Sequence, residues 1–347
     1  MSIIVRHVNI INQIDAEEWN SISPEMPFQS HAWHRFGEKV MEDCLPIYLL
    51  AYQDGTLLGR AVFWVTRNEP LPRSVGNLRT FLDAALFRYP LLICRSPIAQ
   101  TSGLVIARNV ENPKEVATTL IEAALTHGRQ HHCSILVLDY LSREQKTYLP
   151  PELFSMESPD PGHILCNEWT DFHQYLSRGD KKARRHYNRT LRELEGIQVN
   201  IQPCKQAEQI DEILPLIRNV ERQHGAPSNP WMKPLLENMS MVDGTLLTAT
   251  AAGHPVGSLL LLEDGPGQIA TAFGRDQDLP YVYLGLFYEG IHTAMDHKVK
   301  VLRWGSGANE WKRRMGFKPE DNGVIAFTLI QPFTRRVFNR IMPLFWR

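Results

Sequence analysis

The chain has 347 residues, about twice the ~150 residues of a typical domain, so we first expect two domains or one fold used twice. A hydrophobic fraction of 43% and a charged fraction of 22% are those of a folded protein and exclude an intrinsically disordered chain. The 37 Lys and Arg residues nearly balance the 38 Asp and Glu residues, so an anionic partner must be recognised by a local patch.

The first residues and the cysteines favour a reducing cytoplasm. Residues 1–7 lead into no apolar stretch with a small-residue cleavage site, and no run approaches the ~18–20 apolar residues that span a bilayer. No Cys-x-x-Cys pair occurs, which argues against a zinc site and a disulfide framework. The adjacent His131 and His132 lack a nearby third ligand, so we predict no metal site. The five cysteines are Cys44, Cys94, Cys133, Cys166 and Cys204.

The first half predicts two helices, a β-hairpin, an amphipathic helix and a buried strand. The hairpin turns at Asp54-Gly55, a dipeptide that favours tight turns. Residues 66–103 have no clear period and are interpreted as a long excursion of this hairpin. The predicted elements are, in order, residues 15–21, 29–42, 47–65, 114–127 and 134–138.

Residues 150–168 form the predicted junction between two domains. Pro150-Pro151 and the run Ser158-Pro-Asp-Pro-Gly162 are dense in residues that interrupt regular structure. We place the boundary near residue 165, which gives an N-terminal domain over 1–164 and a C-terminal domain over 165–347.

The second half repeats the order of elements of the first half. Its hairpin turns at Ala252-Gly253 and is again followed by a helix and a strand. Strands interleaved with helices indicate an α/β or α+β fold, in which helices flank a mixed sheet. The predicted elements are helices over 170–195 and 206–224, the hairpin over 245–262, a helix over 284–296 and a strand over 299–304.

A basic segment opens the second half. Residues 178–192 contain seven Lys or Arg residues against one acid, Asp180. Helical spacing places Lys181, Arg185 and Arg189 on one face together with Arg192, a face suited to the phosphates of a nucleotide sugar, a phospholipid, CoA or tRNA. A solvated helix face is the alternative. His186 is interpreted as an addition to this patch and not as a base.

Three segments of the second half carry a resemblance: 175–195, 271–277 and the run Trp304-Gly-Ser-Gly-Ala-Asn-Glu-Trp-Lys-Arg-Arg-Met-Gly-Phe-Lys-Pro319. In this order they resemble the GNAT superfamily of N-acyltransferases, in its FemAB-like branch. Phe28-Gln-Ser-His-Ala-Trp33 resembles the opening of the same branch, so the likeness covers nearly the whole chain. It implies two tandem GNAT-like domains, the first degenerate, with the active centre mainly in the second and a contribution from the cleft between them.

Two motifs depart from the family pattern. The usual pyrophosphate loop before a helix is replaced by residues 278–286, in which only Gly285 is retained. Helix-start amides normally hold the phosphates there, so ordinary acetyl-CoA binding is put in doubt. The family's Asp-Leu-Gly is replaced by Arg303-Trp304-Gly305, which removes a carboxylate.

The predicted site residues follow from this resemblance. Lys312 is expected to stabilise the oxyanion of a tetrahedral intermediate, and Arg275 and Tyr281 complete the catalytic set. Packing or surface roles are the alternatives for each of them. Glu289 and His292, one helical turn apart, could deprotonate an amine. The predicted binding residues are Lys181, Arg185, Arg189, Tyr283, Gly285, Trp304, Gly305, Ser306, Gly307 and Trp311.

The predicted activity is transfer of an acyl or aminoacyl group to an amine. Among members of the branch, this predicts a role in cell-envelope or polysaccharide synthesis. No tightly bound cofactor is expected; the co-substrate is acyl-CoA or aminoacyl-tRNA, and an acyl carrier protein is a further candidate partner. The acceptor is a small molecule or an envelope precursor. Apolar and basic residues alternate at helical spacing over 332–347, which would allow peripheral membrane contact. A non-catalytic protein that binds phosphates or nucleotide sugars is the alternative.

Overall fold

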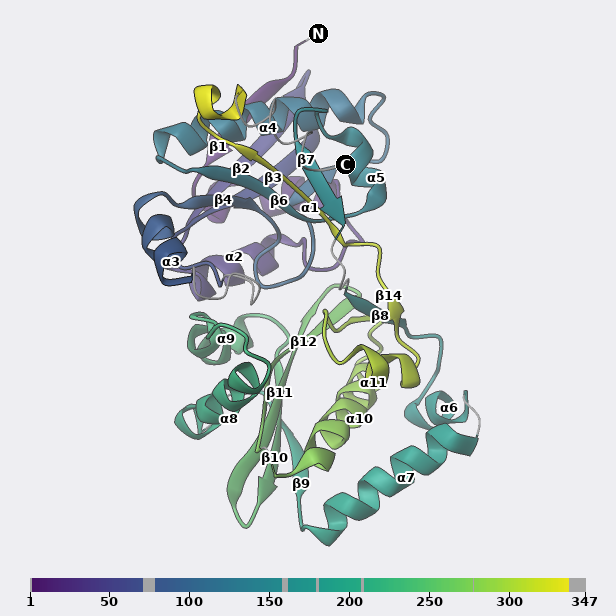
Figure 1. The fold of residues 1–347 in the computed structure, drawn as a ribbon. Coiled ribbons are helices and arrows are strands. Elements are labelled where there is room, and N and C mark those ends of the chain that lie inside the picture. Colours follow the sequence, from purple (N-terminus) through teal and green to yellow (C-terminus); the bar gives the residue numbers. More distant parts are fainter. Residues whose placement is uncertain are drawn as a thin grey trace. The chain divides into compact units, whose positions relative to one another are not determined.

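The computed structural model describes residues 2–70, 79–157, 162–178, 181–206, 209–276 and 278–336. These residues divide into two compact units, each built around one mixed sheet with helices packed on it (Figure 1). The first unit contains most of the chain before residue 162 together with the chain from Asp321 onward. The second unit contains residues 162–320.

The first sheet has the strand order β1-β2-β3-β4-β6-β15-β7, and β5 pairs with β3. Its strands are β1 (Ile4–Val8), β2 (Leu45–Gln53), β3 (Thr56–Thr66), β4 (Leu91–Cys94), β5 (Leu104–Ile106), β6 (Ile135–Leu141), β7 (Phe154–Glu157) and β15 (Val324–Leu329). The helices of this unit are α1 (Ala16–Ser21), α2 (His31–Val40), α3 (Arg79–Arg88), α4 (Pro113–Gln130) and α5 (Arg143–Tyr148).

The second sheet has the order β14-β8-β13-β12-β11-β10-β9. Its strands are β8 (His163–Cys166), β9 (Asn200–Cys204), β10 (Thr245–Ala251), β11 (His254–Asp264), β12 (Gly267–Arg275), β13 (Val301–Arg303) and β14 (Lys318–Pro319). The helices are α6 (Phe172–Ser177), α7 (Lys181–Gly196), α8 (Ile210–Gln223), α9 (Met232–Asn238), α10 (Pro280–Asp296) and α11 (Asn309–Arg314). Short 3₁₀ turns lie at Ile11–Gln13 and Met239–Met241.

The internal repeat is confirmed and extends to four strands. In the first sheet β2, β3 and β4 pair antiparallel in turn, and β4 then pairs parallel with β6. In the second sheet β10, β11 and β12 do the same, and β12 pairs parallel with β13. A parallel pair needs a crossover, and the crossover ends in a helix each time, α4 and α10. The mixed α/β fold predicted from the sequence is therefore present twice.

Both predicted hairpin turns are confirmed. Asp54 and Gly55 have φ of 51° and 79°, and Ala252 and Gly253 have φ of 50° and 83°. Two successive positive φ angles are the requirement of a two-residue turn that matches strand twist, which explains a glycine at the second position.

Two expectations about chain organisation differ from the structure. Residues 66–103 are not an excursion of the hairpin, because they contain α3 and β4, the third strand of the repeat. The C-terminal region does not stay with the second sheet: β15 pairs with β6 and β7 in the first one. The second unit thus ends at residue 320 and not at residue 347.

Each unit has its own apolar core. In the first, α4 packs its buried face against β2 and β3, and Asn112 caps the start of this helix. In the second, α10 is buried along most of its length between α7 and the strands β10–β12. α8 packs on β11 and β12 from the other side of the sheet (Figure 1).

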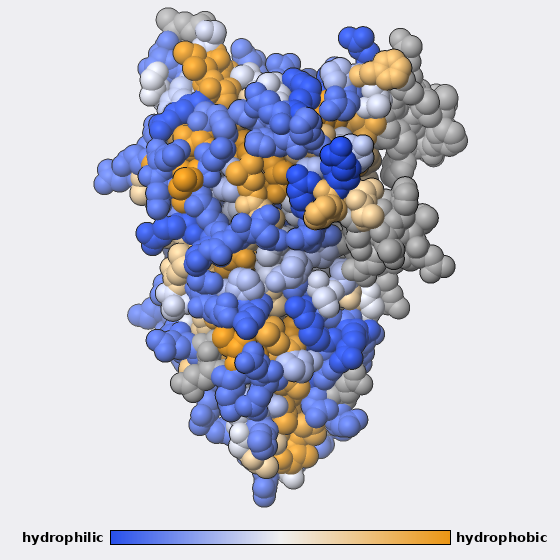
Figure 2. Space-filling view, turned by 90° about the vertical axis from the view of Figure 1, so that its left-hand side faces the viewer, coloured by the Kyte–Doolittle hydropathy of each residue, from blue (hydrophilic) through white to orange (hydrophobic). Residues whose placement is uncertain are grey.

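In the part of the chain that the structure describes, no helix is both long and apolar enough to cross a bilayer. The amphipathic helix predicted over 332–347 is described only to residue 336, where a helical turn is present; residues 337–347 lie outside the described part. The face shown in Figure 2 is mainly hydrophilic, with separate apolar areas on both units.

Candidate active site

The second unit opens where β12 and β13 stop pairing. The two strands pair in parallel only over Gly267–Ile269 and Val301–Arg303. Beyond this point, Trp304 donates its backbone N–H to the carbonyl of His163 at 2.9 Å. His163 belongs to β8, the other neighbour of β13 in the sheet. The rest of β12 therefore separates from the chain that follows β13.

A β-bulge in β12 lies at this opening. Leu260 pairs with Thr271 and Ser258 pairs with Gly274, so that Leu259 alone faces Ala272 and Phe273. Ala272 has φ of 48°, and the Ser258 hydroxyl donates to the Ala272 carbonyl at 3.3 Å. Bulges bend a strand and re-aim its side chains, and they are frequent beside active sites.

A pocket of about 820 Å³ lies at this opening. Residues from both sides of the sheet line it: Val220 comes from α8 and His224 follows the end of this helix, whereas His186 and Leu284 come from α7 and α10. Elements on both faces of the sheet therefore contribute to the pocket. Its other lining residues are Arg189, Leu259, Ala270, Phe273, Arg275, Pro280, Tyr281, Tyr283, Phe287, Trp304, Ser306, Gly307, Ala308, Trp311, Lys312 and Arg314.

The exposed part of the pocket is basic. Arg189 and Arg314 keep 65% and 57% of their side chains exposed, and Arg275 is half-buried. We call these three arginines the basic rim. Arg189 also lies over Tyr281, with its guanidinium 5.7 Å from the ring centre, and Arg275 donates to Gln223 at 3.1 Å. The rim is therefore suited to phosphate or carboxylate groups.

The buried part of the pocket is apolar. Leu259, Leu284, Phe287 and Trp304 are each at most 6% exposed, and we call them the apolar interior. The rings of Phe287 and Trp304 meet edge to face at 5.0 Å. This geometry is the favoured one for aromatic pairs and fixes the walls of the pocket.

Lys312 lies beside the pocket but its ammonium group is already bound. The residue is 3% exposed, and Nζ donates to the carbonyls of Trp304, Gly305 at 2.9 Å and Ser306 at 3.3 Å. Three carbonyls can take all three N–H groups of the ammonium. This arrangement makes Lys312 a clamp on the turn that follows β13, which differs from the direct contact with an oxyanion that we expected.

The clamp determines which way the backbone of the turn points. A peptide group is planar and trans, so its N–H points opposite to its C=O. The carbonyls that converge on Lys312 Nζ thereby direct the N–H groups of Gly305, Ser306 and Gly307 away from it. Gly305 and Gly307 have φ of 61° and 83°, a conformation that favours glycine.

His186, which we expected only to extend the basic patch, lines the pocket. Its Nδ1 lies 2.8 Å from the Tyr288 hydroxyl, and its ring packs on Trp311 with centres 5.3 Å apart. Burial, together with Arg314 and Arg189, lowers the pKa of His186, while burial raises the pKa of Tyr288 to about 12. The imidazole is therefore neutral at neutral pH. The 3.6-residue period that places residues 183, 186 and 190 on the inner face of α7 was the available signal.

Tyr283 and Trp304 bring unsatisfied donors to the same region. The Tyr283 hydroxyl and the Trp304 indole N–H are buried and have no hydrogen-bond partner among the described residues. Burial raises the pKa of Tyr283, although Arg275 acts in the opposite direction, so the hydroxyl keeps its proton.

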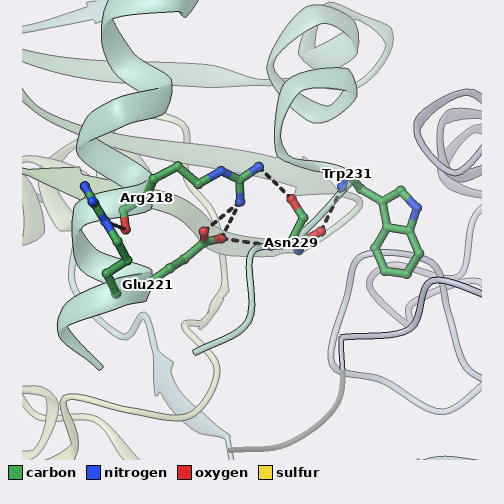
Figure 3. Close-up of polar contacts among 5 residues, drawn as sticks. Arg218, Glu221, Asn229 and Trp231 are labelled. Carbon is green, nitrogen blue, oxygen red and sulfur yellow. Dashed lines mark hydrogen bonds and ion pairs between the residues drawn. The ribbon is translucent and has the colours of Figure 1, made fainter. Parts of the chain in front are cut away.

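A polar network holds the end of α8 that reaches the pocket (Figure 3). Arg218 donates to both carboxylate oxygens of Glu221, at 2.6 and 2.9 Å, and to the Asn229 carbonyl at 3.0 Å. Glu221 accepts from the Asn229 backbone at 3.0 Å, and the Asn229 side chain accepts from Trp231 at 2.9 Å. These bonds fix the loop after α8, and with it the turn that carries Val220 and His224.

Several predicted residues lie outside the pocket. Lys181 and Arg185 are exposed on α7 and do not line it. Gly285 lies inside α10, where an added Cβ would meet Leu194 at 2.6 Å and Ile201 at 2.8 Å; it serves helix packing and is not at a helix start. Arg178, from the basic segment, precedes α7 and donates to the Tyr175 and Met315 carbonyls.

The proposed base pair is also separate from this pocket. Glu289 and His292 face each other at 3.6 Å on α10, and neither lines the pocket. The structure does bring together Arg189, Arg275, Tyr281, Tyr283, Trp304, Ser306, Gly307, Trp311 and Lys312.

The model of the FemAB_like family, described as peptidoglycan biosynthesis/recognition, matches residues 10–340. The chain belongs to this family. The curated proteins include no relative that matches it.

Solved structures share the fold over nearly the whole chain. FemX matches with a TM-score of 0.59 and 10% identity, covering 96% of this chain and 99% of FemX. A tandem GNAT protein from the clavulanic acid biosynthesis pathway matches with a TM-score of 0.58 and 10% identity, covering 95% and 99%. The C-terminal domain of a putative lysylphosphatidylglycerol synthetase from Agrobacterium fabrum gives 0.52 and 10%, covering 96% and 97%. The family member described here therefore has the tandem GNAT fold.

Proposed function

We propose that this FemAB-like protein is an N-acyltransferase of cell-envelope synthesis, which moves an acyl or aminoacyl group from a thioester or ester donor to an amine. The observation that carries the proposal is the pocket of the second unit, which lies at the separation of β12 from β13 and combines a basic rim with an apolar interior. The FemAB_like and GNAT families are families of transferases, and the family description refers to peptidoglycan.

The donor's phosphates would bind at the basic rim. Arg189 and Arg275 supply bidentate donors, and the amides at the start of α10 add the partial positive charge of a helix terminus. The part of β12 beyond its pairing with β13 offers backbone groups to an extended, amide-containing arm such as pantetheine.

The protein must stabilise the oxyanion of the intermediate, accept a proton from the amine and return a proton to the leaving group. The amine nitrogen attacks the donor carbonyl, the C–N bond forms, and the C–S or C–O bond to the donor breaks. A backbone N–H of the turn over Gly305–Gly307 would stabilise the oxyanion of the intermediate. His186 would take the proton that the amine loses, since its lowered pKa keeps it neutral, and the leaving thiol or hydroxyl would receive a proton in turn.

The acceptor would approach from the side opposite to the donor. Residues from both faces of the sheet line the pocket, which offers the two substrates separate sides of it. We propose an amine on an envelope precursor, in the cytoplasm, as the acceptor.

The test is a transfer assay with the full chain. Acyl-CoA, acyl carrier protein and aminoacyl-tRNA are offered as donors to amine-bearing peptidoglycan precursors, and the product is detected by mass spectrometry. Arg275→Ala should raise KM for the donor at least tenfold with a smaller effect on kcat. Tight binding of a nucleotide-linked precursor, with no transfer from any donor, would instead support the binding-protein alternative.

A further inference from the structure

The charges that line the pocket have one sign. Arg189, Arg275, Lys312 and Arg314 line it together with two histidines, and no Asp or Glu is among the described residues that line it. Lys312 is buried, and the three arginines stand at the exposed end. Arg189 and Arg314 are each paired with a glutamate on their own helix, Glu193 and Glu310, but neither glutamate lines the pocket. An anion gains from this arrangement, whereas a cation finds no carboxylate among the described residues of the pocket wall.

A donor that carries an aminoacyl group would place an ammonium next to its carbonyl. Once the donor's phosphates lie on the basic rim, that ammonium would enter the pocket without a carboxylate partner. Burying a charge without a partner is strongly unfavourable, and the nearby guanidinium groups add repulsion. The carbonyls of Trp304, Gly305 and Ser306 converge on Lys312 Nζ, so a second ammonium that approached them would meet the charge of this buried lysine.

The interior favours an apolar chain. Leu259, Leu284, Phe287 and Trp304 form buried walls, and Val220 and Ala270 extend the apolar lining at intermediate burial. The pocket of about 820 Å³ is as large as those that bind drug-sized ligands, and far larger than an acetyl group needs. An acetyl group would leave most of this apolar surface uncovered.

We propose that the group transferred is an uncharged, medium- or long-chain apolar acyl group carried on phosphopantetheine, and neither an acetyl nor an aminoacyl group. This inference rests on the proposed function and names its donor class. Coenzyme A and an acyl carrier protein share that thioester chemistry, and the experiment distinguishes them.

Binding of unreactive donor analogues tests the inference without turnover. Thioethers of CoA that carry ethyl, hexyl, dodecyl or 2-aminohexyl groups are titrated into the full chain by calorimetry. Each buried methylene should improve Kd about fourfold until the interior is filled. The 2-aminohexyl thioether should bind at least tenfold more weakly than the hexyl thioether. Equal Kd values for ethyl and dodecyl, or equal or tighter binding of the amine, would overturn the inference.

A second titration tests whether an acyl carrier protein is the source of the acyl group. An acyl carrier protein loaded with ethyl or dodecyl thioether is titrated in the same way. A dodecyl preference seen only with the carrier protein supports the inference and identifies that protein as the source. Absence of a chain-length effect in both arms contradicts it, as does tighter binding of an aminoacyl-tRNA than of any alkyl thioether.

Substitutions in the pocket wall test where the chain binds. Ala270→Leu should weaken dodecyl-CoA binding about tenfold and leave free CoA unaffected, because the added methyl groups fill the apolar part. Ala251→Leu, on β10 and away from the lining, is the matched control and should change neither. Val220→Phe narrows the pocket from α8 and replaces Ala270→Leu if that variant fails to fold. Unchanged dodecyl binding in a folded variant would contradict the assignment.

Failure of the inference and failure of the proposed function give different results. Transfer of an aminoacyl group from tRNA to an amine would keep the acyltransferase and refute the apolar donor. Chain-length-dependent binding, with no transfer to any amine, would keep the donor class and refute the transferase.

Discussion

Lys312 shows how burial changes what a charged side chain can do. The sequence places it in a motif where a lysine near the reacting carbonyl is expected, and the pocket does lie beside it. Its ammonium group is nevertheless bound to three carbonyls of one turn. Removing it should therefore disturb the turn and its backbone N–H groups, and the effect on catalysis should follow from that disturbance.

Substitution of Lys312 separates these two roles. Lys312→Met should lower the free energy of unfolding by about 1–3 kcal/mol, because buried carbonyls lose their donors. It should also lower kcat/KM. Arg313→Met, at the exposed neighbouring position, is the control for loss of a charge and should change the unfolding free energy by no more than ~0.5 kcal/mol. Urea unfolding measures both. An unchanged unfolding free energy with a lost kcat would instead indicate direct action of the ammonium group.

The pH dependence of transfer should report His186. Its lowered pKa lies below the ordinary value of about 6.5, and the neutral imidazole is the form that accepts a proton. The rate should thus hold constant through neutral pH and fall as the pH drops through this lowered pKa. His186→Asn should lower kcat by about 10²–10⁴-fold and remove the acidic limb of the profile.

Tyr288→Phe provides a graded control for this assignment. It removes the hydroxyl that lies 2.8 Å from Nδ1 and should reduce kcat less than His186→Asn does, while the acidic limb remains. An unchanged acidic limb in His186→Asn would show that another group is the base.

At the level of elements, the bulge in β12 and the packing of α10 shape the site. The bulge at Ala272 bends β12 away from the chain after β13, and α10 follows directly on the end of that strand. The separation depends on which strands become neighbours in the sheet. Gly285 belongs to the same assembly, since it lets α7 and β9 approach α10 closely.

Gly285→Ala tests packing against phosphate binding. The added Cβ would lie 2.6 Å from Leu194, so overpacking should lower the free energy of unfolding by about 1–3 kcal/mol and leave Kd for CoA unchanged. Gly196→Ala at the end of α7, where nothing lies within 4 Å, is the matched control and should be neutral or stabilising by up to ~1 kcal/mol. Thermal unfolding and CoA titration measure the two effects. Weaker CoA binding with unchanged stability would restore the phosphate-loop interpretation.

At the level of the whole molecule, the return of the chain to the first sheet governs which fragments can fold. The second unit is continuous over 162–320. The first unit is not, because β15 lies between β6 and β7 in the strand order. A fragment that ends before β15 leaves β6 with an unpaired edge and β7 with no neighbour in the sheet.

Expression of fragments checks this dependence. Residues 162–320 should unfold cooperatively by themselves, whereas residues 1–161 should not. Joining 321–347 to residues 1–161 through a flexible linker should restore cooperative unfolding, and it is the control for fragment length. A cooperative transition in residues 1–161 alone would contradict the role given to β15. Circular dichroism during urea titration measures each fragment.

Local sequence signals determined the repeated elements of this protein. The dipeptides Asp54-Gly55 and Ala252-Gly253 predicted both hairpin turns, and their φ angles are positive in the structure. Apolar periods predicted α4, α10 and the strands that follow them. Such signals act over a few residues, so they can be read without the fold. The family resemblance pointed to Arg275, Tyr281 and Trp304, and these three residues line one pocket.

Tertiary structure alone decided the roles of these residues. Whether Lys312 meets a substrate or three carbonyls, whether His186 is neutral, and whether Gly285 serves phosphates or packing all depend on neighbours far away in the sequence. The same holds for β15, whose pairing partners β6 and β7 lie well over a hundred residues earlier. Burial and pairing are properties of contacts between distant segments, and those contacts exist only once the chain has folded.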